Sequence, residues 1–249
     1  MALLLVDAGN SRVKWGAHDG DAWLQQGVVE NVDIARLSEA WKAYTPPQLM
    51  VVSNVAGEKV RSALRVLSGR WAVDPHWVQP KAAQCGVCNR YEAAEKLGAD
   101  RWAALIGAWN LFQRSCLIVN VGTAMTVDAL SDEGVFLGGI IVAGPDLMRA
   151  ALSSKAPVIG QPRGKFASFP TNTADAVYSG AWMALSGAVE RMLSEMQQSE
   201  MRQPLCVLSG GAAALLQTRL NVPTRIVENL VLEGLVRIAL ERAATRENT

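Results

Sequence analysis

Short apolar runs separated by turn-forming residues occupy the first thirty positions of the chain. Hydrophobic and polar residues alternate over 2–29, and Gly, Asn, Ser and Asp gather at 8–11 and 18–21. This pattern predicts a meander of three strands joined by two tight turns. The same pattern returns near the middle of the chain and predicts three further strands, at 116–121, 124–130 and 135–143.

Helical spacing of apolar residues follows each group of strands. The segments with this spacing are 33–44, 57–67, 91–114, 173–197, 211–217 and 228–245, with short buried strands expected at 49–53 and 205–208. Prolines, glycines and lysines predict a mobile loop over 153–170. Strands followed by helix–strand alternation in both halves indicate an α/β protein with two lobes, residues 1–114 and 115–249.

The first predicted turn carries polar residues that suit a phosphate group. The apolar run Leu3–Val6 ends in Asp7, and Asn10 and Ser11 occupy the bend. A tight bend exposes backbone N–H groups beside short polar side chains, which favours anion binding, and the acid can hold a magnesium ion or its water shell. An ordinary hairpin turn is the alternative interpretation, because Asn and Gly are common turn residues.

A second copy of this pattern strengthens the phosphate interpretation. The strand ending at Asn120 leads through Gly122 and Thr123 into another strand that carries Thr126. Asp7 and Asn120 lie 113 positions apart, close to half the chain length, which suggests two related halves offering paired hairpins to a shared cleft. A third apolar strand, 205–208, ends in the glycines at 210 and 211, which would allow close approach to a ring or ribose.

An acidic and a basic residue near the start of the predicted helix 91–114 are candidates for chemistry. Asp100 could accept the proton of a substrate hydroxyl, and Arg101 could bind an anionic substrate group through two hydrogen bonds. Phosphoryl transfer needs mainly positioning and charge neutralisation, so these roles suffice beside a magnesium ion. The alternative is structural, because Asp near a helix start is a favoured capping residue.

Composition narrows the class of protein. The 249 residues carry a formal net charge of +1 and are 50% hydrophobic, which argues against a nucleic-acid-binding surface. No secretory signal or membrane span is expected, since the first apolar run stops at Asp7. Cys85 and Cys88 have the spacing of half a zinc site without a second pair, so reduced thiols in a cytoplasmic protein are expected. The tryptophans at helical spacing are expected to pack in the core.

The ordered motifs resemble those of the type III pantothenate kinases, a family that includes the Bvg accessory factors. That family opens with Asp-x-Gly-Asn-Thr, matched here by Asp7, Gly9 and Asn10, with Ser11 in place of Thr. Its Gly-x-Asp-Arg signature is matched in full from Gly98 to Arg101. Its Asp-x-Gly-Thr-Ala-x-Thr signature is matched at Gly122, Thr123, Ala124 and Thr126. Later matches are Gly138-Gly139-Ile140, Gly144-Pro145, Asn172–Ala176 and Ser209-Gly210-Gly211.

The resemblance implies a fold of the actin-like ATPase and sugar kinase (ribonuclease H-like) type, with two lobes around a central cleft. It implies transfer of the ATP γ-phosphate to pantothenate, giving 4′-phosphopantothenate, the first step of coenzyme A biosynthesis. It also implies Mg²⁺ or another divalent cation, a monovalent cation (K⁺ or NH4⁺) and a homodimer. Neither nucleic acid nor a membrane is an expected partner.

The resemblance also implies roles for individual residues. Asp100 would be the catalytic base, and the pantothenate site would contain Tyr91, Gly98, Ala99, Asp100, Arg101 and Thr173. ATP and its phosphates would contact Asp7, Ala8, Gly9, Asn10, Ser11, Arg12, Val13, Lys14, Gly122, Thr123, Thr126, Gly210 and Gly211, with Asp7 holding the divalent metal. The monovalent cation would lie at position 120, where the family pattern has Asp and this chain has Asn120.

Two other functions remain compatible with these residues. A kinase of the same superfamily could act on another small molecule that carries a hydroxyl group. A catalytically weak accessory or regulatory protein could keep the fold and bind a partner, and Asn120 motivates this alternative. An intact Asp100 argues against a purely accessory role, because such a role has no need of that carboxylate.

Overall fold

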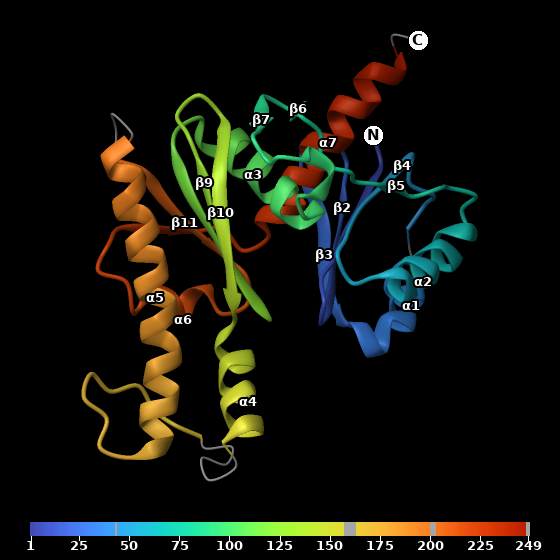
Figure 1. Cartoon of the computed structure of the whole chain (residues 1–249). Coiled ribbons are helices and arrows are strands. Elements are labelled where there is room, and N and C mark those ends of the chain that lie inside the picture. Colours follow the sequence, from blue (N-terminus) through green and yellow to red (C-terminus); the bar gives the residue numbers. More distant parts are fainter. Residues whose placement is uncertain (43, 157–162, 200–202, 248–249) are drawn as a thin grey trace. The chain divides into compact units, whose positions relative to one another are not determined.

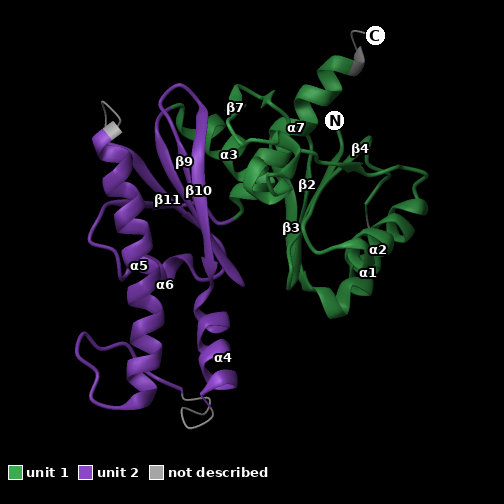
Figure 2. Ribbon diagram, in the orientation of Figure 1, with its two compact units in different colours: residues 1–113, 229–249 green, residues 114–228 purple. Residues whose placement is uncertain are grey.

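The strands of the two halves of the chain follow the same order within their sheets. The computed structural model describes all residues except 43, 157–162, 200–202 and 248–249 (Figure 1). It divides into unit 1, residues 1–113 and 229–249, and unit 2, residues 114–228 (Figure 2). Unit 1 has the strand order β3-β2-β1-β4-β5, and unit 2 has the corresponding order β10-β9-β8-β11-β12. This equivalence confirms the two related halves expected from the repeated motif.

The described residues of unit 1 form the predicted meander and four α-helices. Its strands are β1 Leu3–Ala8, β2 Arg12–His18, β3 Trp23–Glu30, β4 Leu49–Asn54, β5 His76–Trp77, β6 Ala83–Gln84 and β7 Val87–Asn89. Its helices are α1 Leu37–Ala40, α2 Glu58–Gly69, α3 Ala99–Phe112 and α7 Leu230–Glu247, with 3-10 turns η1 Asn31–Arg36 and η2 Ala94–Lys96.

Unit 2 repeats the three-stranded opening and then alternates helix and strand. Its strands are β8 Cys116–Val121, β9 Ala124–Leu130, β10 Val135–Ala143, β11 Leu205–Ser209 and β12 Thr224–Ile226. Its helices are α4 Pro145–Lys155, α5 Thr173–Ser199 and α6 Ala213–Gln217. The three predicted strands 116–121, 124–130 and 135–143 are confirmed residue for residue.

Alternation along β1 sends successive side chains to opposite faces of the sheet in unit 1. Leu4, Val6 and Ala8 pack in a core cluster with Leu37 of α1 and Leu64 of α2. The other face of the sheet is covered by α7, which contacts β1 and β4, and by α3, which contacts β4. Asp7 therefore lies on the face covered by α3 and α7.

Helices α3 and α7 approach each other closely through two glycines. A Cβ on Gly234 would lie 1.8 Å from the Ala103 carbonyl oxygen, and one on Gly107 would lie 2.5 Å from the Leu230 carbonyl oxygen. Such distances exclude any side chain on either helix at the crossing. This packing assigns residues 229–249 to unit 1, which differs from the expected division into 1–114 and 115–249.

Helix boundaries differ from the sequence expectation at several points. The helix expected over 91–114 begins only at Ala99, because Leu97 and Gly98 are extended and Gly98 forms the N-cap. The helix expected over 33–44 is a 3-10 turn followed by one short α-helical turn, α1. Strand β12 was not predicted, since three residues of mixed polarity carry no clear period.

The expected loop over 153–170 is partly regular structure. Its first residues complete α4, and residues 157–162 lie outside the described part of the chain. Residues 163–169 run along α5, where the Lys165 N–H donates to Asp175 Oδ1 at 2.7 Å and the Ala167 N–H donates to Ser179 Oγ at 2.9 Å. The mobility predicted for this loop stays a prediction.

The glycine crossing predicts a specific stability effect. Gly234→Ala should lower the free energy of unfolding by about 1–3 kcal/mol, because the new methyl group overpacks the α3–α7 contact. Gly69→Ala in α2 is the matched control, since no atom lies within 4 Å of its added Cβ, and it should be neutral or slightly stabilising. Urea denaturation of both variants checks this, and equal effects would contradict the packing argument.

Candidate active site

Three polar residues lie in one row across the middle of the sheet in unit 1. Asp7 on β1 is opposite Lys14 on the antiparallel strand β2 and opposite Ser53 on the parallel strand β4. Residues opposite one another in adjacent strands point to the same face, so the three side chains are neighbours. The Lys14 ammonium donates to Asn229 Oδ1 at 3.2 Å, which connects this row to the start of α7.

The Asp7 carboxylate is partly buried without enough hydrogen bonds or positive charge to offset the loss of water around it. The residue is half-buried, yet its Oδ1 is buried and lacks a hydrogen-bond partner among the described residues, as does the nearby Ser53 hydroxyl. Burial, and to a smaller extent the negative charge of Asp100, raise the pKa of Asp7 to about 7. The positive charge of Lys14 lowers the pKa without offsetting the burial. Asp7 and Asp100 therefore lie close enough to interact electrostatically.

Asp100 is the second residue of α3, at the end where helix N–H groups are unpaired. Burial raises its pKa, while the Arg101 N–H, which donates to Asp100 Oδ1 at 2.8 Å, and the Arg101 charge lower it. Arg101 is only 6% exposed, and its guanidinium lies 5.9 Å from the centre of the Tyr91 ring. The helix start thus holds a half-buried acid beside a buried cation, with an exposed aromatic ring near the cation.

The hairpin β6–β7 is joined to α3 and α7 through Gln84. Trp102 Nε1 donates to Gln84 Oε1 at 3.2 Å, and Gln84 Nε2 donates to Glu241 Oε2 at 2.8 Å. Trp102 itself is fully buried, as expected for a core residue. These bonds stabilise the segment that leads from the hairpin to Tyr91.

The Cys-x-x-Cys spacing fits the turn of this same hairpin. Cys85 and Gly86 have φ values of 50° and 79°, which is the conformation of a two-residue type I′ turn. The Cys85 thiol is held protonated, because burial and the Glu241 carboxylate raise its pKa to about 12. The described residues contain no group of three or more His, Cys, Asp and Glu that could hold a metal ion.

Unit 2 contains a row equivalent to that in unit 1. Asn120 on β8 is opposite Thr126 on β9 and Ser209 on β11, with the same strand directions as for Asp7, Lys14 and Ser53. Gly210 follows this row with φ of 93°, and a Cβ there would lie 2.6 Å from Asn120 Oδ1. The structure therefore brings together the expected residues Asn120, Thr126 and Gly210, and it makes Asn120 the counterpart of Asp7.

The turns that follow β1 and β8 are each closed by a glycine N–H, although the first turn is one residue longer. The Gly9 N–H donates to the Arg12 carbonyl and the Gly122 N–H donates to the Ala124 carbonyl, each at 3.0 Å. Thr123 belongs to the second turn, and its carbonyl oxygen accepts a hydrogen bond from the Gly144 N–H at 2.9 Å. Both sequence-predicted hairpins are confirmed as hairpins.

Among the described residues, the acids in unit 1 fit a divalent cation. Oxygen ligands are what Mg²⁺ prefers, and Asp7 offers a buried oxygen without a donor, near a second carboxylate on Asp100. Two interacting carboxylates of this kind are stabilised by a bound cation. Asn120 offers an amide oxygen without formal charge, which suits a weaker cation interaction.

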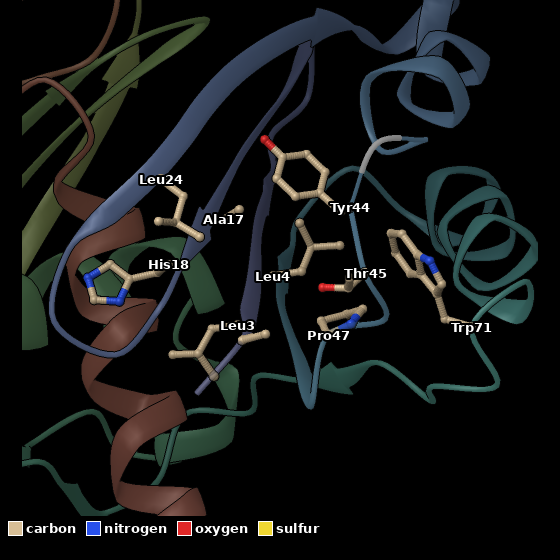
Figure 3. Close-up of a pocket in the computed structure, with 10 residues that line it drawn as sticks. Leu3, Leu4, Ala17, His18, Leu24, Tyr44, Thr45, Pro47 and Trp71 are labelled. Carbon is tan, nitrogen blue, oxygen red and sulfur yellow. The ribbon is translucent and has the colours of Figure 1, made fainter.

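A separate pocket lies at the opposite ends of β1 and β2 from Asp7 and Lys14 (Figure 3). It is mainly apolar, includes Leu3, Leu4 and His18, and has a volume of about 50 Å³. Pockets for drug-sized ligands measure about 300–1,000 Å³, so this one is too small for a nucleotide or pantothenate. It contains none of the predicted site residues.

Some of the polar neighbours were not predicted from the sequence. Ser53 and Asn229 join the Asp7 row only because β4 and α7 fold back onto β1 and β2 from distant parts of the chain. Ser209 was part of the predicted Ser209-Gly210-Gly211 motif, but its place beside Asn120 comes from the pairing of β11 with β8. Thr173, expected at the substrate site, is the first residue of α5 in unit 2 and is exposed.

Solved structures show that the chain has the fold of actin-like ATPases and sugar kinases. A Baf family protein from Campylobacter jejuni aligns with a TM-score of 0.63 at 20% identity, over 97% of this chain and 99% of that one. MreB5 of Spiroplasma citri bound to ADP aligns with a TM-score of 0.56 at 13% identity, over 100% of this chain and 99% of that one. The expected fold class is confirmed. No helix in the described residues has the length and apolar character needed to cross a membrane.

Sequence relatives narrow the class to one family. Residues 3–195 match the family model of the type III pantothenate kinases. The type III pantothenate kinase of Nitrosospira multiformis is 48% identical over 243 residues, covering 98% of this chain and 93% of that protein. That of Nitrosomonas eutropha is 49% identical over 241 residues, covering 95% and 94%. The chain belongs to the type III pantothenate kinase family. It is a transferase that phosphorylates pantothenate in coenzyme A biosynthesis, with ATP and a divalent cation.

The raised pKa of Asp7 predicts how stability changes with pH. Between about pH 4 and 7 the folded state binds more protons than the unfolded state, so the free energy of unfolding falls as the pH rises through this interval. Asp7→Asn removes this dependence, and its stability gain over the parent should be about 2.5 kcal/mol larger at pH 8 than at pH 5. Urea denaturation in a chelating buffer measures this. Asp74→Asn, at an exposed position, is the control for removing one carboxylate. A gain in the free energy of unfolding of Asp7→Asn that does not change with pH would contradict the raised pKa of Asp7.

Proposed function

We propose that Asp7 and Asp100 form the catalytic centre for phosphorylation of pantothenate. The observation that carries this is the electrostatic interaction of the two acids, one of which has a buried oxygen without a donor. A purely structural pair of like charges would be destabilising, so the presence of both acids favours a role with a cation and an anionic substrate. In this proposal Asp7 would hold the divalent metal, which neutralises charge on the phosphate oxygens when bound.

Asp100 would act as the general base. The hydroxyl oxygen of pantothenate forms a bond to the γ-phosphorus of ATP while its proton passes to the Asp100 carboxylate, and the bond from phosphorus to the bridging β,γ oxygen breaks to release ADP. The pKa of Asp100 is raised by burial, which brings its basicity closer to neutral pH and improves proton transfer. The Arg101 backbone N–H and, to a smaller extent, the Arg101 charge act in the opposite direction and lower the pKa of Asp100.

The pantothenate carboxylate is the group that Arg101 would recognise. Buried Arg–carboxylate pairs are strong because the guanidinium offers two parallel N–H groups, and the Tyr91 ring beside it restricts the guanidinium orientation. Gly98, Ala99 and Thr173 are the other residues proposed to bind pantothenate. Gly98 contributes a surface without a side chain next to Asp100 Oδ1, which would lie 2.6 Å from an added Cβ.

The two turns would bind the ATP phosphates. Residues of the first turn and its flanks are Ala8, Gly9, Asn10, Ser11, Arg12, Val13 and Lys14, and those of unit 2 are Gly122, Thr123, Thr126, Gly210 and Gly211. Lys14 provides the positive charge that a phosphate chain requires, beside Asp7. Their equivalent positions in two repeated sheets support this assignment.

A monovalent cation, K⁺ or NH4⁺, is proposed near Asn120, with the amide oxygen as a ligand. We also propose a cytoplasmic homodimer. Exposed apolar side chains on β10 and α4 support self-association: Leu137, Ile141, Leu147 and Leu152. A second copy of this chain would remove this surface from water.

Loss of the proposed base should abolish turnover. Asp100→Asn keeps the size of the side chain but cannot accept the proton, so kcat for phosphopantothenate formation should fall by about 10²–10⁴. The exposed Asp74→Asn should retain parental activity. A coupled ADP-release assay and circular dichroism provide the readouts. Retained activity in a folded Asp100→Asn protein would contradict the role of Asp100.

The uncharged amide at position 120 predicts weak cation activation. When the activity of the parent is measured against increasing Na⁺, K⁺ or NH4⁺, half-maximal activation should require a high concentration of the activating cation. Asn120→Asp restores a full negative charge, and the K⁺ concentration for half-maximal activation should fall severalfold. Asn221→Asp, which adds the same charge at a residue bonded to Glu190 elsewhere in unit 2, is the control. An unchanged K⁺ response in Asn120→Asp would contradict the proposal that the cation binds near this residue.

A further inference from the structure

Asn31 makes three hydrogen bonds to the turn that follows β1. Its side-chain Nδ2 donates to the carbonyl oxygens of Gly9 and Asn10, each at 2.9 Å. Its backbone N–H donates to the carbonyl oxygen of Ser11, also at 2.9 Å. One residue, placed directly after β3, therefore binds the carbonyls of three consecutive residues in the turn.

These bonds fix the direction in which the turn presents its backbone groups. In a planar trans peptide the C=O and the following N–H point in opposite directions. Because the Gly9 and Ser11 carbonyls point toward Asn31, the N–H groups of Asn10 and Arg12 point away from it. Carbonyl oxygens repel phosphate oxygens and N–H groups attract them, so this orientation suits a phosphate on the side opposite Asn31.

The repeat in unit 2 supports a specific function for this position. There the residue directly after the third strand, Gly144, donates its N–H to the Thr123 carbonyl in the equivalent turn. A Cβ on Gly144 would lie 2.1 Å from the Gly122 carbonyl oxygen, so the turn is held there by close backbone approach. The two halves meet the same requirement by different means, an amide side chain in one and a glycine in the other.

The neighbouring ion pair does not provide an equivalent constraint. Arg12 Nε and Glu30 Oε1 are 2.7 Å apart, but their side chains are 58% and 50% exposed. Exposed ion pairs of this kind contribute little to order, because water screens them. Asn31 Oδ1, in contrast, is buried without a partner in the described structure, so the amide is placed for its donor group alone.

We propose that Asn31 is a positioning residue for nucleotide binding, which holds the first turn in the orientation that receives the ATP phosphates. The inference rests on the proposed function, since it assumes that this turn binds phosphate. Asp cannot replace Asn here, because a carboxylate oxygen in place of Nδ2 would face two carbonyl oxygens. The side chain acts through the backbone of the turn and needs no contact with the ligand.

The test compares Asn31→Asp with Asn31→Ala in the full-length protein. Calorimetric titration with Mg²⁺ and the non-hydrolysable analogue AMP-PNP should show at least a tenfold weaker affinity for Asn31→Asp and a smaller loss for Asn31→Ala. In steady-state assays KM for ATP should rise by a similar factor, while KM for pantothenate stays within twofold. Circular dichroism establishes that each variant is folded, and Asn31→Ala keeps the test decisive if Asn31→Asp does not fold.

A matched control is available at the other end of β2. Asp19 Oδ1 accepts the N–H groups of Asp21 and Ala22 at 2.9 and 2.8 Å, so Asp19→Ala also removes two side-chain bonds to a turn of this hairpin. Nucleotide affinity should be unchanged in Asp19→Ala. If both folded Asn31 variants bind AMP-PNP as tightly as the parent, or if Asp19→Ala loses as much affinity as they do, the role of Asn31 is wrong while the proposed function stands. Absence of both AMP-PNP binding and pantothenate phosphorylation in the parent would overturn the proposed function and this inference with it.

Discussion

The burial of one carboxylate on the central strand of unit 1 is the constraint on which the site depends. Strand β1 pairs with β2 on one side and β4 on the other, and alternation along it directs Asp7 to the face that α3 and α7 cover. The covering helices can approach because Gly107 and Gly234 remove side chains at their crossing. The same packing brings the start of α3, with Asp100, into electrostatic range of Asp7. Core packing and the chemistry of the site thus have a common origin.

The repeated sheet explains both the likeness and the asymmetry of the two halves. Each half places a polar row across its central strand and closes the following turn with a glycine N–H bond. The charges differ, because Asp7 and Lys14 correspond to Asn120 and Thr126. Unit 1 therefore has the ionised groups suited to a divalent cation and phosphoryl transfer, whereas unit 2 offers neutral oxygens and close backbone approach.

Prediction from sequence was most reliable where a short segment carried its own signal. Alternating strands and glycine turns gave β1–β3 and β8–β10, because the period-2 pattern and the turn residues agree locally. The helix predicted over 91–114 was too long, because the structure begins α3 only at Ala99. An extended Gly98 and a 3-10 turn before it have no clear signature in hydrophobic periodicity. Ser53, Asn31 and Asn229 were missed as neighbours of the site, because each reaches it through pairing between strands or packing of a distant helix.

The sequence by itself determined the repeated hairpins, the ordered motifs and the family to which the chain belongs, since these depend on residue identity and local spacing. Tertiary structure decided that α7 completes unit 1, that Asn120 is the counterpart of Asp7, and that Asn31 holds the first turn. It also decided the electrostatic state of the acids: the raised pKa values of Asp7 and Asp100 come from burial by segments far along the chain. Desolvation depends on what covers a group in space, and local sequence does not contain that information.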